Sequence, residues 1–326
     1  MIIVTGATGF IGSNIVADLN ARGRTNLLLV DDLGTQGKWK NIAKRRFLDV
    51  VDYRDLDKLL PTLKAADAVF HMGANSSTTS TDGDEILRIN LQASMTWWKW
   101  CTQVSAPLIY ASSAATYGDG QLGFDDNQAL TELDKLAPLN LYGWSKHQFD
   151  KWAIERAAEG SAPPQWAGLK FFNVYGPNEY HKGDMRSLVA KNTELIRCGE
   201  TIRLFKSHKA GFADGAQLRD FVYVKDCTAV MTWLMDHPSV SGLFNLGTGQ
   251  ARSFVDLMQA IGTALGKPVN IEFVDMPESI RPNYQYFTEA RMDKLKAAGC
   301  DLPFHSLERG VADYLDAHLT RLDIYR

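Results

Sequence analysis

The residues best suited to chemistry are Tyr142 and Lys146, which lie four positions apart at the start of a predicted helix. Positions i and i+4 share one face of a helix, so the lysine ammonium can lie beside the tyrosine phenol. A neighbouring cation lowers the pKa of a phenol, and an oxidised nicotinamide would lower it further. Such a phenol can take a proton from an alcohol and return it. By itself, a Tyr-x-x-x-Lys pair is more often an ordinary pair on a helix surface.

A glycine-rich turn near the N-terminus could bind phosphates. Gly6, Gly9 and Gly12 stand between an apolar segment at residues 2–5 and a helical pattern that runs to Leu19. Glycines here permit a tight turn, close approach of the backbone to a pyrophosphate, and close packing of the helix on the strand. The helix N-terminus then offers unpaired N–H groups to the phosphates. We expect a dinucleotide to contact Gly6, Gly9, Phe10, Ile11 and Gly12.

The residues after the second predicted strand bear on which dinucleotide binds. This strand, residues 26–30, ends at Asp31 and Asp32, and an acid at this place holds the ribose hydroxyls of NAD. Five cations follow and could neutralise the 2′-phosphate of NADP, or could form a solvated loop: Lys38, Lys40, Lys44, Arg45 and Arg46. The residues alone therefore leave NAD and NADP open.

The elements that must position these groups alternate between strand and helix. Further strands are predicted at residues 68–71, 107–111, 169–173 and 243–246, with a helix over 85–104. This rhythm predicts an α/β fold with a doubly wound parallel sheet, a Rossmann domain. Residues 176–218 are loop-rich and break the rhythm. We expect a dinucleotide-binding domain at 1–173, to which 219–249 return, and a smaller, discontinuous substrate-binding domain at 174–218 and 250–326.

Composition excludes several other classes of protein. The 326 residues carry a net charge of −3 and are 45% hydrophobic, which gives no electrostatic argument for nucleic acid or an anionic membrane as partner. There is no run of about 18 apolar residues that could span a bilayer. The four cysteines lie far apart without metal-ligand spacing, so we expect free thiols and no metal site. Strand-like residues 2–4 leave no room for a signal peptide, so we expect a cytoplasmic protein.

Five ordered motifs resemble those of the extended short-chain dehydrogenase/reductase family. They are the glycine turn, the hydroxyl-rich segment 110–118, the Tyr142–Lys146 pair, and segments 219–226 and 245–249. The resemblance implies a catalytic set of Ser113, Tyr142 and Lys146, in which Lys146 also holds the nicotinamide ribose. It implies further cofactor contacts at Met72, Gly73, Ala74, Asn75, Ser76, Asn90, Val174 and Lys182.

Within this family, segments 76–79, 112–117 and 172–185 are similar to those of epimerases that invert C6 of an ADP-linked heptose for lipopolysaccharide core assembly. The resemblance implies NADP as cofactor, with NAD possible. Inversion by transient oxidation presents both faces of a ketone to one hydride, which suits two proton-transfer groups. Tyr142 is one, and by resemblance Lys182 is the other, which then needs a depressed pKa. Its His-Lys-Gly turn could instead be an exposed basic turn or a phosphate contact.

The resemblance also implies where the nucleotide sugar binds. The expected contacts are Ser113, Asn173, Asp184, Lys191, Phe205, Lys206, Ser207, His208, Arg219 and Tyr284. A planar guanidinium such as that of Arg219 suits a pyrophosphate, although an ion pair with Asp220 is the alternative. Asp184 and Lys191 stand where the family commonly has serine and histidine. Loop 207–217 is expected to close over the nucleotide.

Two other functions remain open: an epimerase or dehydratase of UDP-, GDP- or dTDP-sugars, and a non-catalytic dinucleotide sensor. Ala114 follows Ser113 where a dehydratase usually carries an acid, and the presence of Tyr142 and Lys146 argues against the sensor. Three tryptophans at 97, 98 and 100 are expected in the core and at a subunit interface, and the resemblance implies a homo-oligomer, a pentamer. His71 is expected to be structural, and residues 321–326 to be a solvated end.

Overall fold

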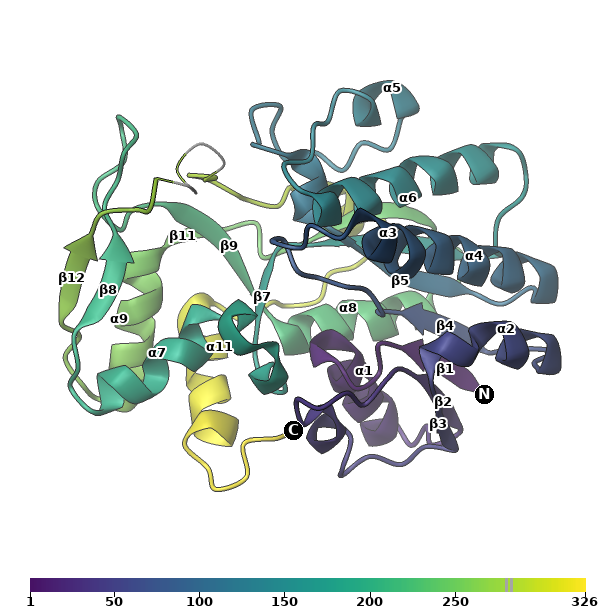
Figure 1. Ribbon diagram of the computed structural model, residues 1–326, viewed down its shortest axis with the longest axis horizontal. Coiled ribbons are helices and arrows are strands. Elements are labelled where there is room, and N and C mark those ends of the chain that lie inside the picture. Colours follow the sequence, from purple (N-terminus) through teal and green to yellow (C-terminus); the bar gives the residue numbers. More distant parts are fainter. Residues whose placement is uncertain (279–280, 282–283) are drawn as a thin grey trace.

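The computed structural model of the protein describes residues 1–278, 281 and 284–326 (Figure 1). Its main sheet has seven parallel strands in the order β10-β6-β5-β4-β1-β2-β3. These strands are β1 (Ile2–Thr5), β2 (Leu27–Val30), β3 (Asp49–Val51), β4 (Ala68–His71), β5 (Leu108–Ser113), β6 (Trp166–Phe171) and β10 (Gly242–Leu246). The expected doubly wound parallel sheet is confirmed. Strand order reverses between β1 and β4, and open α/β sheets bind ligands beside such a reversal.

Helices cover both faces of this sheet (Figure 1). Along β1, Ile2 and Val4 pack with α1 (Phe10–Ala21) and α8 (Val224–Asp236), whereas Ile3 packs with α4 (Ala93–Val104) and α6 (Leu141–Ala158). Alternate side chains of a strand point to opposite faces, so a continuous apolar run fits a strand buried on both sides. Trp97, Trp98 and Trp100 are all buried in the α4–α6 layer, which confirms their place in the core.

The expected helix over residues 85–104 is confirmed, with a local irregularity. It begins as α3 (Gly83–Ile86), continues through a π-helical turn at Leu87–Gln92, and ends as α4. Single π-helical turns inside helices often occur at functional sites. This one carries Asn90, one of the expected cofactor contacts.

A smaller group of elements lies beside the carboxyl ends of the main strands, at the left of Figure 1. One sheet joins β7 (Asn173–Tyr175), β9 (Leu218–Tyr223) and β11 (Ala251–Ser253), and another joins β8 (Ile202–Phe205) and β12 (Ile271–Val274). The helices α7 (Leu188–Arg197), α9 (Phe254–Leu265) and α11 (Leu307–Tyr314) share one apolar core with them. Further short α-helices are α2 (Leu56–Leu59), α5 (Leu130–Leu133) and α10 (Asp293–Ala297). None of the helices in the described ranges is both long and apolar enough to cross a membrane.

The expectation of a solvated C-terminal end is wrong for residues 324–326. The Tyr180 hydroxyl donates to the Ile324 carbonyl at 2.8 Å, and the rings of Tyr180 and Tyr325 meet edge to face with centroids 5.2 Å apart. The Arg326 amide donates to Asn178 Oδ1 at 3.0 Å, and its guanidinium pairs with a carboxylate on α1. Aromatic and polar partners far away in the sequence therefore dock this segment.

Candidate active site

The turn between β1 and α1 has no room for side chains at Gly6 and Gly12. Gly6 has a φ of +62°, and a Cβ there would lie 2.6 Å from the Gly73 backbone nitrogen. A Cβ on Gly12 would lie 2.0 Å from the Gly6 carbonyl oxygen, because α1 packs directly on the turn. Helix α1 begins after Gly9, which has no capping side chain, so its first N–H groups can serve an anion. The turn therefore fits a dinucleotide pyrophosphate.

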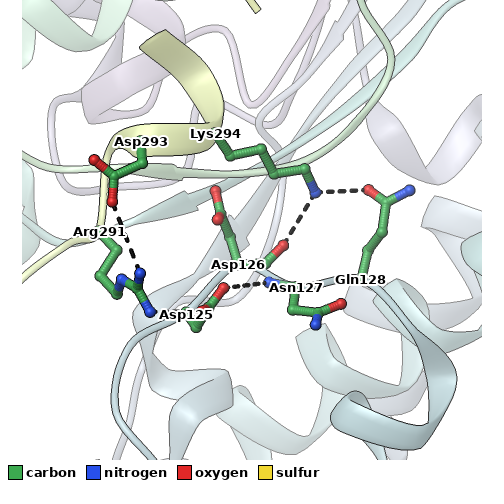
Figure 2. A pocket seen from close by; sticks show the side chains of 7 residues that line it. All are labelled: Asp125, Asp126, Asn127, Gln128, Arg291, Asp293 and Lys294. Atoms are coloured by element: carbon green, nitrogen blue, oxygen red, sulfur yellow. Dashed lines mark hydrogen bonds and ion pairs between the residues drawn. The ribbon is translucent and has the colours of Figure 1, made fainter. Parts of the chain in front are cut away.

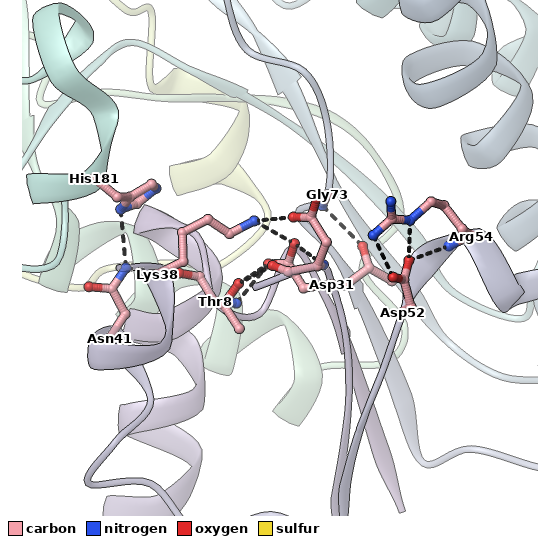
Figure 3. Close-up of polar contacts among 10 residues, drawn as sticks. Thr8, Asp31, Lys38, Asn41, Asp52, Arg54, Gly73 and His181 are labelled. Carbon is pink, nitrogen blue, oxygen red and sulfur yellow. Dashed lines mark hydrogen bonds and ion pairs between the residues drawn. The ribbon is translucent and has the colours of Figure 1, made fainter. Parts of the chain in front are cut away.

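The acidic pair at the end of β2 is engaged by one of the five cations (Figure 3). Thr8 donates to Asp31 Oδ2 from its amide at 2.8 Å and from its hydroxyl at 2.6 Å. Lys38 Nζ lies 2.9 Å from Asp31 Oδ1 and 2.6 Å from Asp32 Oδ1. Burial alone would lower the pKa of Lys38, but the two carboxylates outweigh it and raise that pKa. The chain thus brings two acids and a cation to the ribose position.

The segment after β4 is tied to the helices around it. The Asn75 amide donates to Asn90 Oδ1 at 2.8 Å, and Asn90 Nδ2 donates back to the Asn75 carbonyl at 2.9 Å and to Ser145 Oγ at 3.0 Å.

His71, the last residue of β4, is bonded at both nitrogens of its ring. These nitrogens contact the Thr5 hydroxyl at 2.7 Å and the Ser94 hydroxyl at 2.9 Å. Burial lowers the pKa of His71 to about 3, so this histidine is neutral and structural, as expected.

The three expected catalytic side chains meet where β5 ends and α6 begins. Ser113 closes β5, and Asn140 caps α6 by accepting the Gly143 amide at 2.8 Å, which sets Tyr142 and Lys146 on the first turns. A Cβ at Gly143 would lie 2.6 Å from the Ala115 carbonyl oxygen, so only glycine lets α6 approach the Ser113 segment this closely.

The direction of the Tyr142 pKa shift differs from the expectation. Burial raises the pKa of Tyr142, and the hydrogen bond with the Ser113 side chain offsets this only in part. Lys146 is buried as well, which lowers its pKa to about 8 against the opposing charge of Asp150. The expected lowering of the phenol pKa is therefore wrong for the protein's own groups, because burial and the negative charge of Asp150 both raise the Tyr142 pKa and only the Ser113 hydrogen bond lowers it.

Lys182 lines a cavity of about 300 Å³ among the smaller group of elements, between β7, β9, α7 and α9. Its lining includes Asn173, Val174, Phe221 and Phe254. The ammonium lies 5.5 Å from the centre of the ring of Phe10, the first residue of α1, the helix that follows the dinucleotide turn. Burial lowers the pKa of Lys182, against the charge of Glu179. A half-buried lysine with a lowered pKa can act as a base. The alternative that Lys182 belongs to an exposed basic turn is wrong for this side chain, because it is half-buried.

Arg219 lies between two aromatic rings. Its guanidinium carbon is 5.6 Å from the centre of the Phe254 ring and 5.2 Å from that of Tyr284. Burial lowers the pKa of Arg219. The Asp220 carboxylate accepts the Thr248 amide at 2.7 Å and the Ala290 amide at 3.0 Å instead of pairing with Arg219. The guanidinium donates to the Leu218 carbonyl at 2.9 Å and to the Gln285 carbonyl, so it is held by backbone acceptors and not by a carboxylate.

The other expected substrate contacts are less closely grouped. Phe205 meets Tyr284 edge to face with centroids 6.3 Å apart, beside Arg219. Lys206 pairs with Asp275 at 3.7 Å, and the His208 amide donates to the Tyr286 hydroxyl at 2.9 Å. Ser207 is tied within its own loop, Lys191 is half-buried on α7, and Asp184 is exposed.

A second cavity, of about 470 Å³, lies apart from these residues (Figure 2). Its charged groups pair with one another: Arg291 meets Asp125 at 2.7 Å, and Lys294 Nζ donates to the Asp126 carbonyl at 3.0 Å and to Gln128 Oε1 at 2.8 Å. The cavity therefore joins the stretch 119–136 to α10 and presents no candidate chemistry.

Two charged residues next to the catalytic set were missed by the sequence reasoning. Asp150 lies four residues after Lys146 on the same face of α6, and Lys170 lies inside the apolar strand β6. A lysine within a strand that is otherwise apolar is a signal that could have drawn attention to it. The two form an ion pair at 2.9 Å.

The sheet order, the glycine turn and the Ser113, Tyr142 and Lys146 cluster define a dinucleotide-dependent enzyme of the short-chain dehydrogenase/reductase class. The chain belongs to the NAD dependent epimerase/dehydratase family, whose sequence profile matches residues 2–247. It is 49% identical, over 99% of both chains, to the ADP-L-glycero-D-manno-heptose-6-epimerase of Nitratidesulfovibrio vulgaris. The expectations of this family and of an epimerase are confirmed.

Solved structures agree with this assignment. The Helicobacter pylori ADP-L-glycero-D-manno-heptose-6-epimerase superposes with a TM-score of 0.79 at 27% identity, covering 97% of this chain and 95% of that chain. The Thermus thermophilus UDP-glucose 4-epimerase, solved in complex with NAD, superposes with a TM-score of 0.75 at 26% identity, covering 97% of both chains. The expectation of a nicotinamide cofactor is thus confirmed at the level of the family.

Proposed function

We propose that this protein epimerises C6 of ADP-D-glycero-D-manno-heptose to give ADP-L-glycero-D-manno-heptose, for lipopolysaccharide core biosynthesis. The observation that carries the proposal is the full-length identity of 49% with an enzyme named for that product. The geometry supports it, because two groups suited to proton transfer come from separate elements: Tyr142 lies on α6 beside Ser113, and Lys182 lies beside Phe10 at the start of α1.

The residues of this chain have distinct roles in the proposed reaction. The turn Gly6–Gly12 with Phe10 and Ile11 would hold the pyrophosphate of the dinucleotide, whose nicotinamide, when bound, would supply reversible hydride transfer at C6. Tyr142 Oη takes the hydroxyl proton of one epimer, with Ser113 donating a hydrogen bond to the sugar oxygen. Lys182 Nζ takes the proton of the other epimer from the opposite side. Lys146 supports Tyr142 and holds the nicotinamide ribose, and Arg219 binds the pyrophosphate of the sugar nucleotide.

We further propose NADP as the preferred dinucleotide, with NAD as the alternative. The support for NADP is the Lys38 ammonium, which pairs with Asp31 and Asp32 and can offset their negative charge where the 2′-phosphate would bind. The support for NAD is the acidic pair itself, together with the NAD found in the Thermus thermophilus relative.

The assembly, the location and the division of the chain are also proposals. From the resemblance we infer a homo-oligomer, a pentamer, that works in the cytoplasm. We infer that residues 1–173 with 219–249 bind the dinucleotide, and that 174–218 with 250–326 bind the sugar. Sedimentation velocity of the purified protein tests the pentamer, and a mass of one or two chains would contradict it.

The experiment that tests the reaction is proton NMR of the purified protein with ADP-D-glycero-D-manno-heptose and no added cofactor. We expect conversion to the L-glycero epimer, because the dinucleotide is retained and regenerated in each turnover. If no conversion occurs even with added NADP and NAD, the heptose assignment is refuted. UDP-, GDP- and dTDP-sugars are then the next substrates to test.

Lys182→Met tests the second proton-transfer group. We expect epimer interconversion to fall by about 10²–10⁴-fold, the usual contribution of a positioned general base. Lys64→Met is the matched control, because Lys64 is exposed and far from the cavity. Near-native rates in both directions for Lys182→Met would remove Lys182 from the mechanism.

A further inference from the structure

A fully buried ion pair lies directly behind the catalytic set. Lys170 Nζ is 2.9 Å from Asp150 Oδ2, and both side chains have 0% exposure. Removing two charges from water is costly, and a buried pair often contributes no more to stability than apolar side chains of similar volume. A pair held in this place therefore calls for an explanation besides stability.

Asp150 is held by three side chains from two strands. Its Oδ2 accepts the Ser112 hydroxyl at 2.7 Å and the Lys170 ammonium, and its Oδ1 accepts the Tyr110 hydroxyl at 3.1 Å. Since α6 places residues four apart on one face, this fixed carboxylate lies on the face that carries Lys146.

Lys170 connects the pair to the end of β5. Its ammonium donates to Thr116 Oγ1 at 2.7 Å, and the Thr116 hydroxyl donates to the Ser113 carbonyl at 2.9 Å. The ammonium also lies 4.9 Å from the centre of the Tyr117 ring. A single network therefore runs from the Asp150 carboxylate to the backbone of Ser113.

We propose that Asp150, locked in place by Lys170, is a positioning residue that keeps the buried ammonium of Lys146 charged beside Tyr142. This inference rests on the proposed roles of Lys146 and Tyr142. The Asp150–Lys170 pair would then set the pH range in which Ser113, Tyr142 and Lys146 work. The contact of Lys170 with Thr116 would hold Ser113 in place through the Thr116 hydrogen bond to its carbonyl.

Five other titratable groups near Lys146 are neutral near pH 7. They come from α6, β4, β5 and the segment after it: Tyr142, His147, His71, Tyr110 and Tyr117. Burial lowers the pKa of both histidines and raises the pKa of all three tyrosines. Burial lowers the pKa of Lys146, and the charge of Asp150 raises it. The other elements packed against α6 carry Glu85 on α3, Arg88 on the π-helical turn and Glu132 on α5.

The test is to titrate Lys146 directly, by ¹³C NMR of protein labelled at the lysine Cε, with its signal assigned by its loss in Lys146→Met. In Asp150→Asn we expect the titration midpoint of Lys146 to fall by about one pH unit or more, the size of shift that a nearby opposite charge produces. The alkaline limb of the pH–rate profile should move to lower pH by the same amount. A merely structural role would lower the rate at every pH without moving the limb.

Two further variants keep the test decisive. Ser112→Ala removes a neutral hydrogen bond to the same carboxylate and leaves its charge, so the Lys146 midpoint should stay in place. The double variant Asp150→Asn, Lys170→Met removes the buried lysine that the single variant leaves unpaired, so it should fold even if the single variant does not. Its Lys146 midpoint should also fall.

An unchanged Lys146 midpoint in the folded Asp150 variants would overturn the inference. The inference would also be overturned if Ser112→Ala shifted the Lys146 midpoint as far as Asp150→Asn does. Because the titration needs no substrate, a native protein that converts no ADP-heptose would refute the proposed function separately and leave this test standing.

Discussion

Replacing Lys38 by methionine tests the preference for NADP at the ribose end of the site. Lys38 Nζ contacts Asp31 Oδ1 at 2.9 Å and Asp32 Oδ1 at 2.6 Å, at the carboxyl end of β2 (Figure 3). The cation neutralises both acids and can turn to a 2′-phosphate. In Lys38→Met the two carboxylates would instead face that phosphate without compensation, and like charges repel.

The size of the effect follows from the contact that is lost. A hydrogen bond to a charged group contributes about 1.5–3 kcal/mol, and a factor of ten in affinity corresponds to about 1.4 kcal/mol. Lys38→Met should therefore weaken NADP binding by roughly ten- to a hundredfold. Binding of NAD, which has a hydroxyl there, should change by less than about threefold, because Asp31 can still accept the ribose hydroxyls.

Isothermal titration calorimetry of the cofactor-free protein with each dinucleotide measures this difference. Lys40→Met is the matched control, because Lys40 is exposed and its ammonium lies 5.9 Å from the Trp39 ring centre, away from the acidic pair. Equal losses for NADP and NAD in Lys38→Met would refute the reasoning. So would a loss of NADP binding of the same size in Lys40→Met.

Three further predictions concern the turn, the pH dependence of stability and the C-terminal segment. In Gly12→Ala the new Cβ would lie 2.0 Å from the Gly6 carbonyl, so the purified variant should lack the dinucleotide absorbance of the native protein; a full complement would contradict this. His71 has its pKa lowered to about 3 when folded, so its contribution is present above the unfolded pKa of about 6.5 and is lost as the pH falls from there towards 3. Urea unfolding should show that the native protein loses about 2 kcal/mol more than His71→Gln between pH 7 and pH 5, and parallel losses would exclude this origin. Tyr325→Ala removes an edge-to-face pair worth about 0.5–1.5 kcal/mol and should lower the unfolding midpoint in calorimetry by about 1–4 °C, whereas Tyr325→Phe should not.

Local features of the sequence were enough to predict the class of fold and much of the site. The apolar runs at β1, β2 and β4 indicate buried parallel strands, and each run shows this in its own sequence without reference to the strands it pairs with. The spacing of Gly6, Gly9 and Gly12 defines the turn, and the four-residue spacing of Tyr142 and Lys146 places both on one helix face. Each of these inferences depends on neighbours within one or two elements.

The tertiary structure decided what depends on residues distant in sequence and on burial. It selected Lys38 from five cations, docked residues 324–326 against the segment before Lys182, and paired Asp150 with Lys170 across α6 and β6. It also reversed the expected direction of the Tyr142 pKa shift. Spacing along the chain specifies which side chains can share a face, but the cost of removing a charge from water depends on everything that folds around it.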